Sequence, residues 1–331
     1  MSGGGAVEAT GSDAKPHNRL EHFPISFFAV AMGLFGLALA LRAAEHGLGL
    51  SALASQAAAV LAIAVFALLA MFYALKMTRH PGAVAEEWAH PVRIAFFPAV
   101  SISLLLMAAT LAPDAPEIAR PIWLLGALGQ AALLMSVMAN WIGHRPFQPA
   151  HLNPAWFIPA VGNVVAPIAG APLGFVELSW LFFSAGLIFW LVLLTLVMNR
   201  LIFHDPLPER LTPTLMILIA PPAVAFIAYL RLGGEVDAFA RILLNTGYVF
   251  AGVVLTQAPK IARLKFALPW WALSFPVAAL TVASLLFAER VGSAPHRWIG
   301  LVLAALLTAM VVGLALRTVA AIRAREICQP E

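Results

Sequence analysis

Residues 269–284 read PWWALSFPVAALTVAS, and this stretch decides how the rest of the chain is interpreted. It places Phe275 directly before Pro276 in the middle of an apolar segment. Proline has no N–H to donate to the carbonyl oxygen of Ala272, so we expect the helix to kink there. Within lipid the freed carbonyl must face protein or water. This helix is therefore predicted to line a cavity with Phe275 at its bend, the alternative being a kinked core helix in which Phe275 only packs.

The composition is that of an all-α integral membrane protein. Of the 331 residues, 62% are hydrophobic and 11% are charged, whereas soluble domains have ~25% charged residues. A membrane-spanning helix needs ~20 apolar residues. Ten such stretches are predicted at 24–43, 50–76, 91–111, 121–142, 154–174, 177–200, 212–231, 238–257, 268–288 and 296–322. The fifth is the least regular, because three prolines interrupt it.

The chain is predicted to form one transmembrane domain over residues 23–322, because no polar stretch between the spans is long enough for a second domain. Residues 1–22 and 323–331 are expected to be cytoplasmic tails. The N-terminal tail carries three consecutive glycines and lacks the apolar core of a cleavable signal, so we expect it to be disordered and retained. Cys328 is the only cysteine, which excludes an intrachain disulfide and a structural metal site of cysteines.

The distribution of basic residues predicts the topology. With ten spans both termini lie on one side, and 14 of the 20 Lys and Arg residues fall on that side. The positive-inside rule therefore places both termini in the cytoplasm of a multi-pass cell-membrane or inner-membrane protein. The six basic residues of the opposite side are Arg42, Arg120, Arg231, Arg241, Arg290 and Arg297.

The prolines inside the spans follow a rhythm. Pro98, Pro159, Pro222 and Pro276 lie in the third, fifth, seventh and ninth spans, whereas the sixth, eighth and tenth contain none. Five repeated helical hairpins, each with a bent helix inside and a straight helix outside, would explain this alternation as a ring around a central pore. The alternative is that proline is simply common in membrane helices.

The spans carry no residues for acid–base or metal chemistry. Every Asp, Glu, Lys and Arg can be placed in a loop, a tail or the last turn of a span, and the histidines fall in similar places. A proton-coupled carrier usually keeps an ionisable relay inside the membrane. HExxH, GxSxG and GxxxxGK[ST] patterns do not occur in the sequence. We therefore expect neither an enzyme nor an ATP-driven pump, and no cofactor, metal or nucleic-acid partner.

The remaining candidates for a pore lining are small or neutral, with one basic residue at a mouth. They are Gly33, Ser101, Asn163 and Ser274, together with Arg93 at the start of the third span. A pore of hydroxyls, carbonyls and apolar side chains would discriminate little between ions, so the basic residues at its cytoplasmic mouth would favour anions. These basic residues can also bind acidic lipid headgroups, and membrane lipids are expected partners.

Five segments in order make the chain resemble the tellurite-resistance/dicarboxylate transporter family. They are FPISFFAVAMGLFG at 23–36, HPVRIAFFP at 90–98, NPAWFIPAVGNVVAP at 153–167, LTPTLMILIAPPAVAFIAYL at 211–230 and WWALSFPVAAL at 270–280. The family includes bacterial TehA proteins, yeast malate and sulfite exporters and the slow anion channels of plant guard cells. The resemblance extends from about residue 20 to residue 322.

The resemblance implies a homotrimer in which each subunit has ten helices, arranged as five hairpins around its own pore. It also implies that a phenylalanine of the ninth helix occludes this pore, and that position falls on Phe275. The sequence is thus interpreted as a passive channel, or channel-like exporter, for small inorganic or organic anions. The alternatives are a secondary carrier for C4-dicarboxylates such as malate and an exporter of tellurite or sulfite.

Overall fold

The computed structural model describes residues 18–143 and 147–329, and within these ranges it contains helices and no strands. Nine helical segments there are long and apolar enough to cross a membrane. A shorter apolar run, Pro154–Gly170, stands where the fifth span is predicted. The fold class is confirmed as an all-α membrane protein. The fifth span differs from its prediction because it is broken into several short helices.

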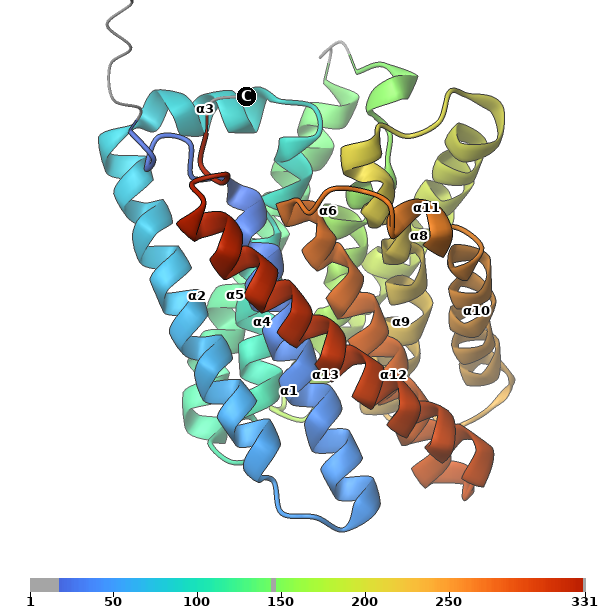
Figure 1. The fold of residues 1–331 in the computed structure, drawn as a ribbon. Helices are drawn as coiled ribbons and strands as arrows, with labels where there is room; N and C mark the ends of the chain where they lie inside the picture. The colour runs from blue at the N-terminus through green and yellow to red at the C-terminus, as the bar shows by residue number, and fades with distance from the viewer. Residues whose placement is uncertain (1–17, 144–146, 330–331) are drawn as a thin grey trace, which may run out of the picture.

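In the described residues, five uninterrupted α-helices, which we call the straight helices, alternate with five segments that begin as 3-10 helices (Figure 1). The straight helices are α2 (Leu53–Arg79), α5 (Pro116–Ile142), α8 (Val176–Phe203), α10 (Ala238–Leu255) and α13 (Ala294–Arg323). The other five are η1 (Ile25–Phe27) with α1 (Phe28–Leu48), η2 (Arg93–Phe96) with α4 (Ala99–Leu111), the run from η4 (Pro154–Trp156) through α6 (Phe157–Val161) and η5 (Gly162–Val165) to α7 (Ala166–Gly170), η6 (Glu209–Ile219) with α9 (Ala220–Arg231), and η7 (Leu268–Leu273) with α12 (Ser274–Val291). Each η element is a 3-10 helix, so every segment of the second class starts as a 3-10 helix and continues as an α-helix.

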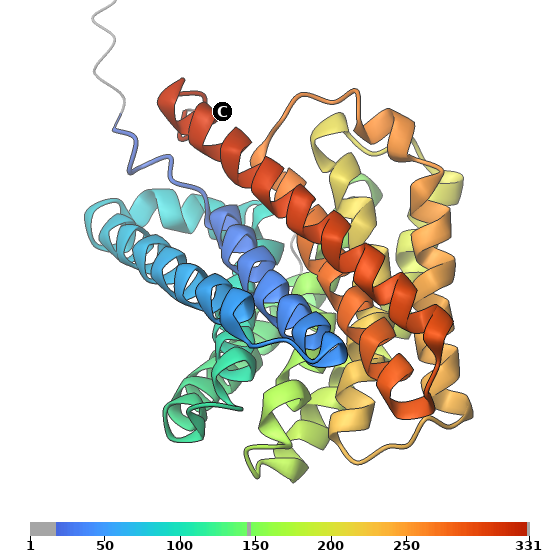
Figure 2. The same cartoon turned by 60° about the horizontal axis from the view of Figure 1, so that its bottom comes forward.

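Burial separates the two classes. The apolar windows of the segments containing α1, α4, α9 and α12 are 72–83% buried, whereas those of the straight helices are 22–33% buried. We call the first class, together with α6 and α7, the inner helices, and the straight class the outer helices. The inner helices form a closed five-helix ring, because α1 contacts α4 and α12, α7 contacts α4 and α9, and α9 contacts α12. Each packs against the outer helix that follows it in sequence, and α13 also crosses over to α1 (Figure 2).

The prolines act at junctions between helices. Pro98 directly precedes α4, while Pro222 and Pro276 each lie in the first turn of an α-helix. Proline is tolerated in the first turn because its missing N–H has no intrahelical partner there. The predicted kinks inside continuous α-helices are therefore replaced by changes from 3-10 to α geometry. Pro159 lies within the short helix α6.

Side chains of the outer helix α5 donate hydrogen bonds to backbone carbonyl groups of the broken fifth segment. Gln130 Nε2 donates to the carbonyl oxygen of Pro159 at 3.0 Å, and Trp123 Nε1 donates to that of Ala166 at 2.8 Å. Both side chains are fully buried. An unpaired carbonyl in an apolar interior is costly, so these donors stabilise a segment in which proline has disrupted the helical hydrogen bonds.

The first and last described residues lie at the same end of the bundle, which we call the terminal side, and the opposite end is the distal side (Figure 1). Residues 1–17 and 330–331 of the predicted tails lie outside the described residues. Near the C-terminus, after α13 ends, Ile327 and Cys328 pack against the hydrophobic core. Burial raises the pKa of the Cys328 thiol.

A buried ion pair ties three elements together on the terminal side. Lys76 of α2 lies 2.9 Å from Glu87 of the short helix α3 (Pro81–Ala89), and both side chains are nearly inaccessible to solvent. Lys76 also donates to the carbonyl oxygen of Phe23 at 2.9 Å. Glu87 accepts from the Tyr73 hydroxyl at 3.0 Å and from the backbone N–H of Ile25 at 3.1 Å. The start of η1 is thus held against α2 and α3.

Candidate functional site

A cavity of about 800 Å³ lies between the inner helices and extends to the distal side. Its inner wall is small and apolar, and includes Gly36, Leu106, Val224, Ala278 and Ala279. Charged and polar residues line its outer end, namely Arg42, His46, Arg120, Arg231, Glu289 and Arg297. We call this outer end the distal mouth. The cavity is large enough to admit hydrated ions between the inner helices.

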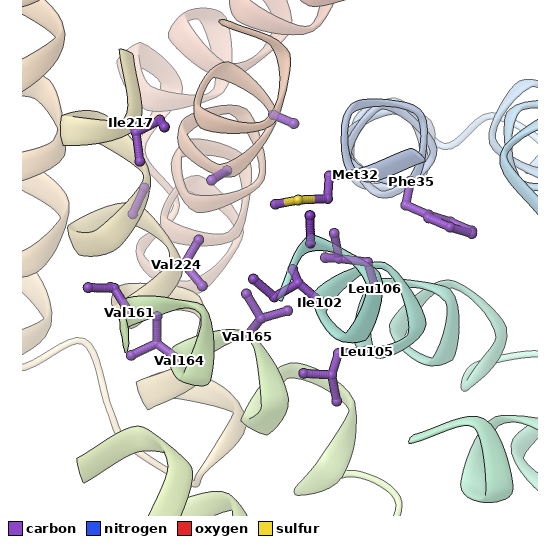
Figure 3. Close-up of a cluster of buried hydrophobic side chains, with 14 of the residues drawn as sticks. Met32, Phe35, Ile102, Leu105, Leu106, Val161, Val164, Val165, Ile217 and Val224 are labelled. Carbon is purple, nitrogen blue, oxygen red and sulfur yellow. The ribbon is translucent and has the colours of Figure 1, made fainter. Parts of the chain in front are cut away.

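A second, smaller cavity of about 70 Å³ continues toward the terminal side. Its lining is almost entirely apolar, and Figure 3 shows Met32, Ile102, Val165 and Val224 pointing toward one another from four different elements. Phe35 of α1 points away from them in the same view. Such a lining offers an anion nothing that replaces its hydration shell.

Phe275 and Val224 are the two residues that line both cavities. Phe275 is half-buried in the first turn of α12, directly after the 3-10 helix η7. Val224 is buried on α9, which contacts α12. Together they form the boundary between the large cavity and the small apolar one, which we call the constriction. The sequence singled out Phe275 but gave no signal for Val224, because α9 is apolar on all sides.

Helices α1 and α12 approach each other closely beside Phe275. A Cβ atom built on Gly36 would lie 2.9 Å from Ala278 Cβ and 3.5 Å from Phe275 Cδ2. One built on Gly33 would lie only 2.2 Å from Ser274 Oγ. Glycine at these positions therefore lets α1 pack directly behind the constriction, although Gly33 itself lines neither cavity.

The predicted polar lining is oriented differently from its prediction. Ser274 Oγ donates to the carbonyl oxygen of Trp271 at 2.7 Å, and Ser101 Oγ donates to that of Pro98 at 2.9 Å. Asn163 donates to the carbonyl oxygens of Pro159 and Ala160. All three side chains are buried and line neither cavity. In an apolar interior such groups pair with the nearest free carbonyl, so their placement in a span does not make them part of a pore.

Of the predicted prolines and Arg93, only Pro276 lines a cavity. Pro276 lines the smaller cavity, and so does Pro221, the neighbour of the predicted Pro222. Pro98 and Pro159 line neither cavity. Arg93 lies in η2 on the terminal side and belongs to neither lining. Within the described residues, no group of three His, Cys, Asp or Glu side chains is placed to hold a metal ion.

The distal mouth is rich in arginine, and only some of these arginines form ion pairs. Arg42 donates to both carboxylate oxygens of Asp114, at 2.5 and 2.8 Å, and this pairing lowers the pKa of Asp114. Arg120 lies 3.4 Å from Glu117. Arg231 and Arg297 form no ion pair or hydrogen bond through their side chains within the part of the chain that the structure describes.

The remaining carboxylate of the distal mouth is Glu289, which lies 3.3 Å from His46. Four arginines therefore face one glutamate in the lining. These arginines are among the six basic residues on the side opposite the termini, where the sequence predicted the weaker positive charge. Arg42 and Arg231 lie toward the C-terminal ends of the inner helices α1 and α9, and Arg120 and Arg297 lie near the starts of the outer helices α5 and α13. This placement was the available signal.

The chain matches a family model described as "Voltage-dependent anion channel" over residues 22–319. It is 28% identical to the S-type anion channel SLAH3 of Arabidopsis thaliana over 91% of this chain and 48% of that protein. It is 27% identical to the guard cell S-type anion channel SLAC1 of the same plant, over 88% of this chain and 54% of that one. The chain thus spans about half the length of these plant relatives. A tellurite resistance protein TehA homolog of Haemophilus influenzae is 29% identical over 80% of this chain and 81% of that protein.

Proposed function

The chain belongs to the voltage-dependent anion channel family, and from that premise we propose that it passes small anions passively across the cell membrane through the five-helix ring. Phe275 would be the gate. One observation carries the proposal: Phe275 and Val224 separate a large cavity, which is open to a basic mouth, from a small apolar one. The terminal side would face the cytoplasm, as the positive-inside rule indicates.

The gate would act by excluding water. An anion that reaches the constriction from the large cavity keeps its hydration shell, but the phenyl and isopropyl groups offer no polar atoms to replace it. Transfer of an ion into such an environment without compensation is very unfavourable, and hydrophobic constrictions close channels in this way. Removal of the phenyl group would join the two cavities and lower the barrier.

The test is current recording on purified protein in planar bilayers, comparing wild type with Phe275→Leu and Phe275→Ala. We expect currents to rise in that order, and by at least about tenfold for alanine, because each ~1.4 kcal/mol removed from a barrier raises a rate tenfold. Phe183→Ala is the control, since Phe183 is buried on the outer helix α8 and lines neither cavity. It should lose stability without gaining current.

A well-folded Phe275→Ala protein that conducts no better than wild type would remove Phe275 from the gate. Saturating, pH-coupled flux would instead support a secondary carrier of dicarboxylates, and transport restricted to tellurite or sulfite would support an exporter of those ions. We also propose the homotrimer that the resemblance implies, which native mass spectrometry in detergent would test.

A further inference from the structure

We propose that Arg231 and Arg297 form an anion-collecting site at the distal mouth, which raises the local concentration of small hydrated anions before they reach Phe275. This inference rests on the proposed function and deepens it. It locates the electrostatic selection of anions on the distal side, opposite the cytoplasmic mouth that the count of basic residues favoured.

The first argument for this site is that the arginines of the distal mouth differ in their ion pairs. Arg42 is neutralised locally by Asp114, and Arg120 lies beside Glu117. Arg231 and Arg297 have no such partner among the described residues, yet both line the large cavity. Guanidinium groups remain charged at all physiological pH values and present several N–H donors. Glu289 is the one carboxylate of the lining and it acts on Arg231, but it shares that lining with four arginines. The net field directed into the cavity is therefore positive.

The position of Arg231 on its helix gives the second step. Arg231 is the last residue of α9 and lies seven residues after Val224 on the same helix. Seven residues of α-helix span about 10 Å, so the arginine lies two turns from the constriction. The Debye length is ~30 Å at 0.01 M ionic strength and ~10 Å at 0.1 M. An anion waiting at Phe275 therefore experiences the charge of Arg231 in dilute salt.

The size of the effect follows from Coulomb's law. At about 10 Å, one charge raises the local anion concentration about twofold if the cavity has the dielectric constant of water, and about tenfold or more at an effective value near 20. Removing Arg231 should thus reduce anion current by about twofold to tenfold at 10 mM salt, and removing Arg297 should reduce it in the same sense. The reduction should shrink toward zero at 1 M, where the Debye length is only ~3 Å.

The effect should also depend on direction. A charge at the distal mouth concentrates anions that arrive from the distal side, so current carried by those anions should fall more than current carried from the terminal side. The Phe275→Ala background should therefore conduct asymmetrically in dilute symmetrical salt, and adding Arg231→Gln should reduce this asymmetry. A purely structural role would lower both directions equally.

The experiment is current recording in the Phe275→Ala background, with chloride or nitrate as the probe ion. Arg231→Gln and Arg297→Gln are compared with Arg231→Lys, which keeps the charge and should keep the current. Arg241→Gln is the matched control. Arg241 lies on the distal side, but its guanidinium packs over the Phe287 ring and it is not part of the cavity lining.

Variants that remove a negative charge near the mouth provide a second test, because they should change the current in the opposite direction. Asp114→Asn would leave Arg42 without its counter-charge, and Glu289→Gln would remove the one carboxylate of the lining. Both should increase current from the distal side at 10 mM salt. Equal currents in all these variants at low salt, with Phe275→Ala still conducting, would overturn the anion-collecting site. A silent Phe275→Ala background would instead count against the proposed gate and channel.

Discussion

The buried pair of Lys76 and Glu87 predicts a large loss of stability when one partner is removed. Lys76→Met deletes the 2.9 Å ion pair with Glu87 and the 2.9 Å hydrogen bond to the Phe23 carbonyl oxygen. Glu87 would then remain as a buried carboxylate with only the Tyr73 hydroxyl and the Ile25 N–H as donors. Breaking a buried ion pair in this way typically costs ~3–5 kcal/mol. We expect Lys76→Met to fall in that range.

A double variant distinguishes the ion pair from simple packing. Lys76→Met combined with Glu87→Leu removes both charges, so no uncompensated carboxylate stays buried, and such apolar replacements of a pair are often neutral. The double variant should therefore be more stable than the sum of the single losses predicts, with a coupling energy of ~1–3 kcal/mol.

The free energy of unfolding would be measured by titration with sodium dodecyl sulfate in mixed micelles. Lys260→Met is the control, because Lys260 is exposed on the same side, and it should change stability by less than about 0.5 kcal/mol. The reasoning would be refuted if Lys76→Met were as stable as that control, or if the losses in the double variant were simply additive.

Three further predictions concern packing, pH and energetics. Gly33→Ala should destabilise the folded protein by ~1–3 kcal/mol, because the added Cβ would lie 2.2 Å from Ser274 Oγ. Gly313→Ala is the control, since a Cβ there meets open space, and its effect on stability should be neutral or slightly favourable. Thermal unfolding in detergent measures both variants. Asp114→Asn should cost less than about 1 kcal/mol at pH 7, because the pair with Arg42 is partly exposed. The pKa of Asp114 is lowered in the folded state, so this contribution is present above its unfolded value and lost as pH falls through the lowered one; wild type and variant should unfold alike in strong acid. Anion flux into liposomes should persist when the pH difference is removed at constant voltage, and its collapse would favour a carrier.

The spans and their two classes could be predicted because they depend on properties that sequence records directly. Apolar length marks a span, and the proline-bearing third, seventh and ninth spans are more buried than the proline-free sixth, eighth and tenth. The sequence also singled out Phe275, because it precedes Pro276 at a change of backbone geometry, and its role as a gate stays a prediction. The predicted kink inside a continuous α-helix was wrong. Pro276 lies in the first turn of α12, directly after a 3-10 helix.

The lining of the cavities could not be predicted, because it depends on which face of each helix points inward. In a helix that is apolar on all sides, hydrophobic periodicity does not indicate that face. Val224 and Ser101 illustrate this. Val224 looks like any other apolar residue of its span but borders both cavities. Ser101 is polar but lines neither cavity, and its one hydroxyl lies within hydrogen-bond distance of the Pro98 and Gln130 oxygens.

The separation between the arginines and the constriction is itself consistent with conduction. A channel must bind ions well enough to attract them and weakly enough to release them. An arginine beside Phe275 would hold an anion at the barrier through direct charge-assisted hydrogen bonds, and it would also attract water to the gate. At about two turns along α9, Arg231 can raise the number of anions that arrive without contacting them at the constriction. Under the proposed function, the distal mouth therefore sets how often anions reach the gate, and Phe275 with Val224 sets whether they cross it.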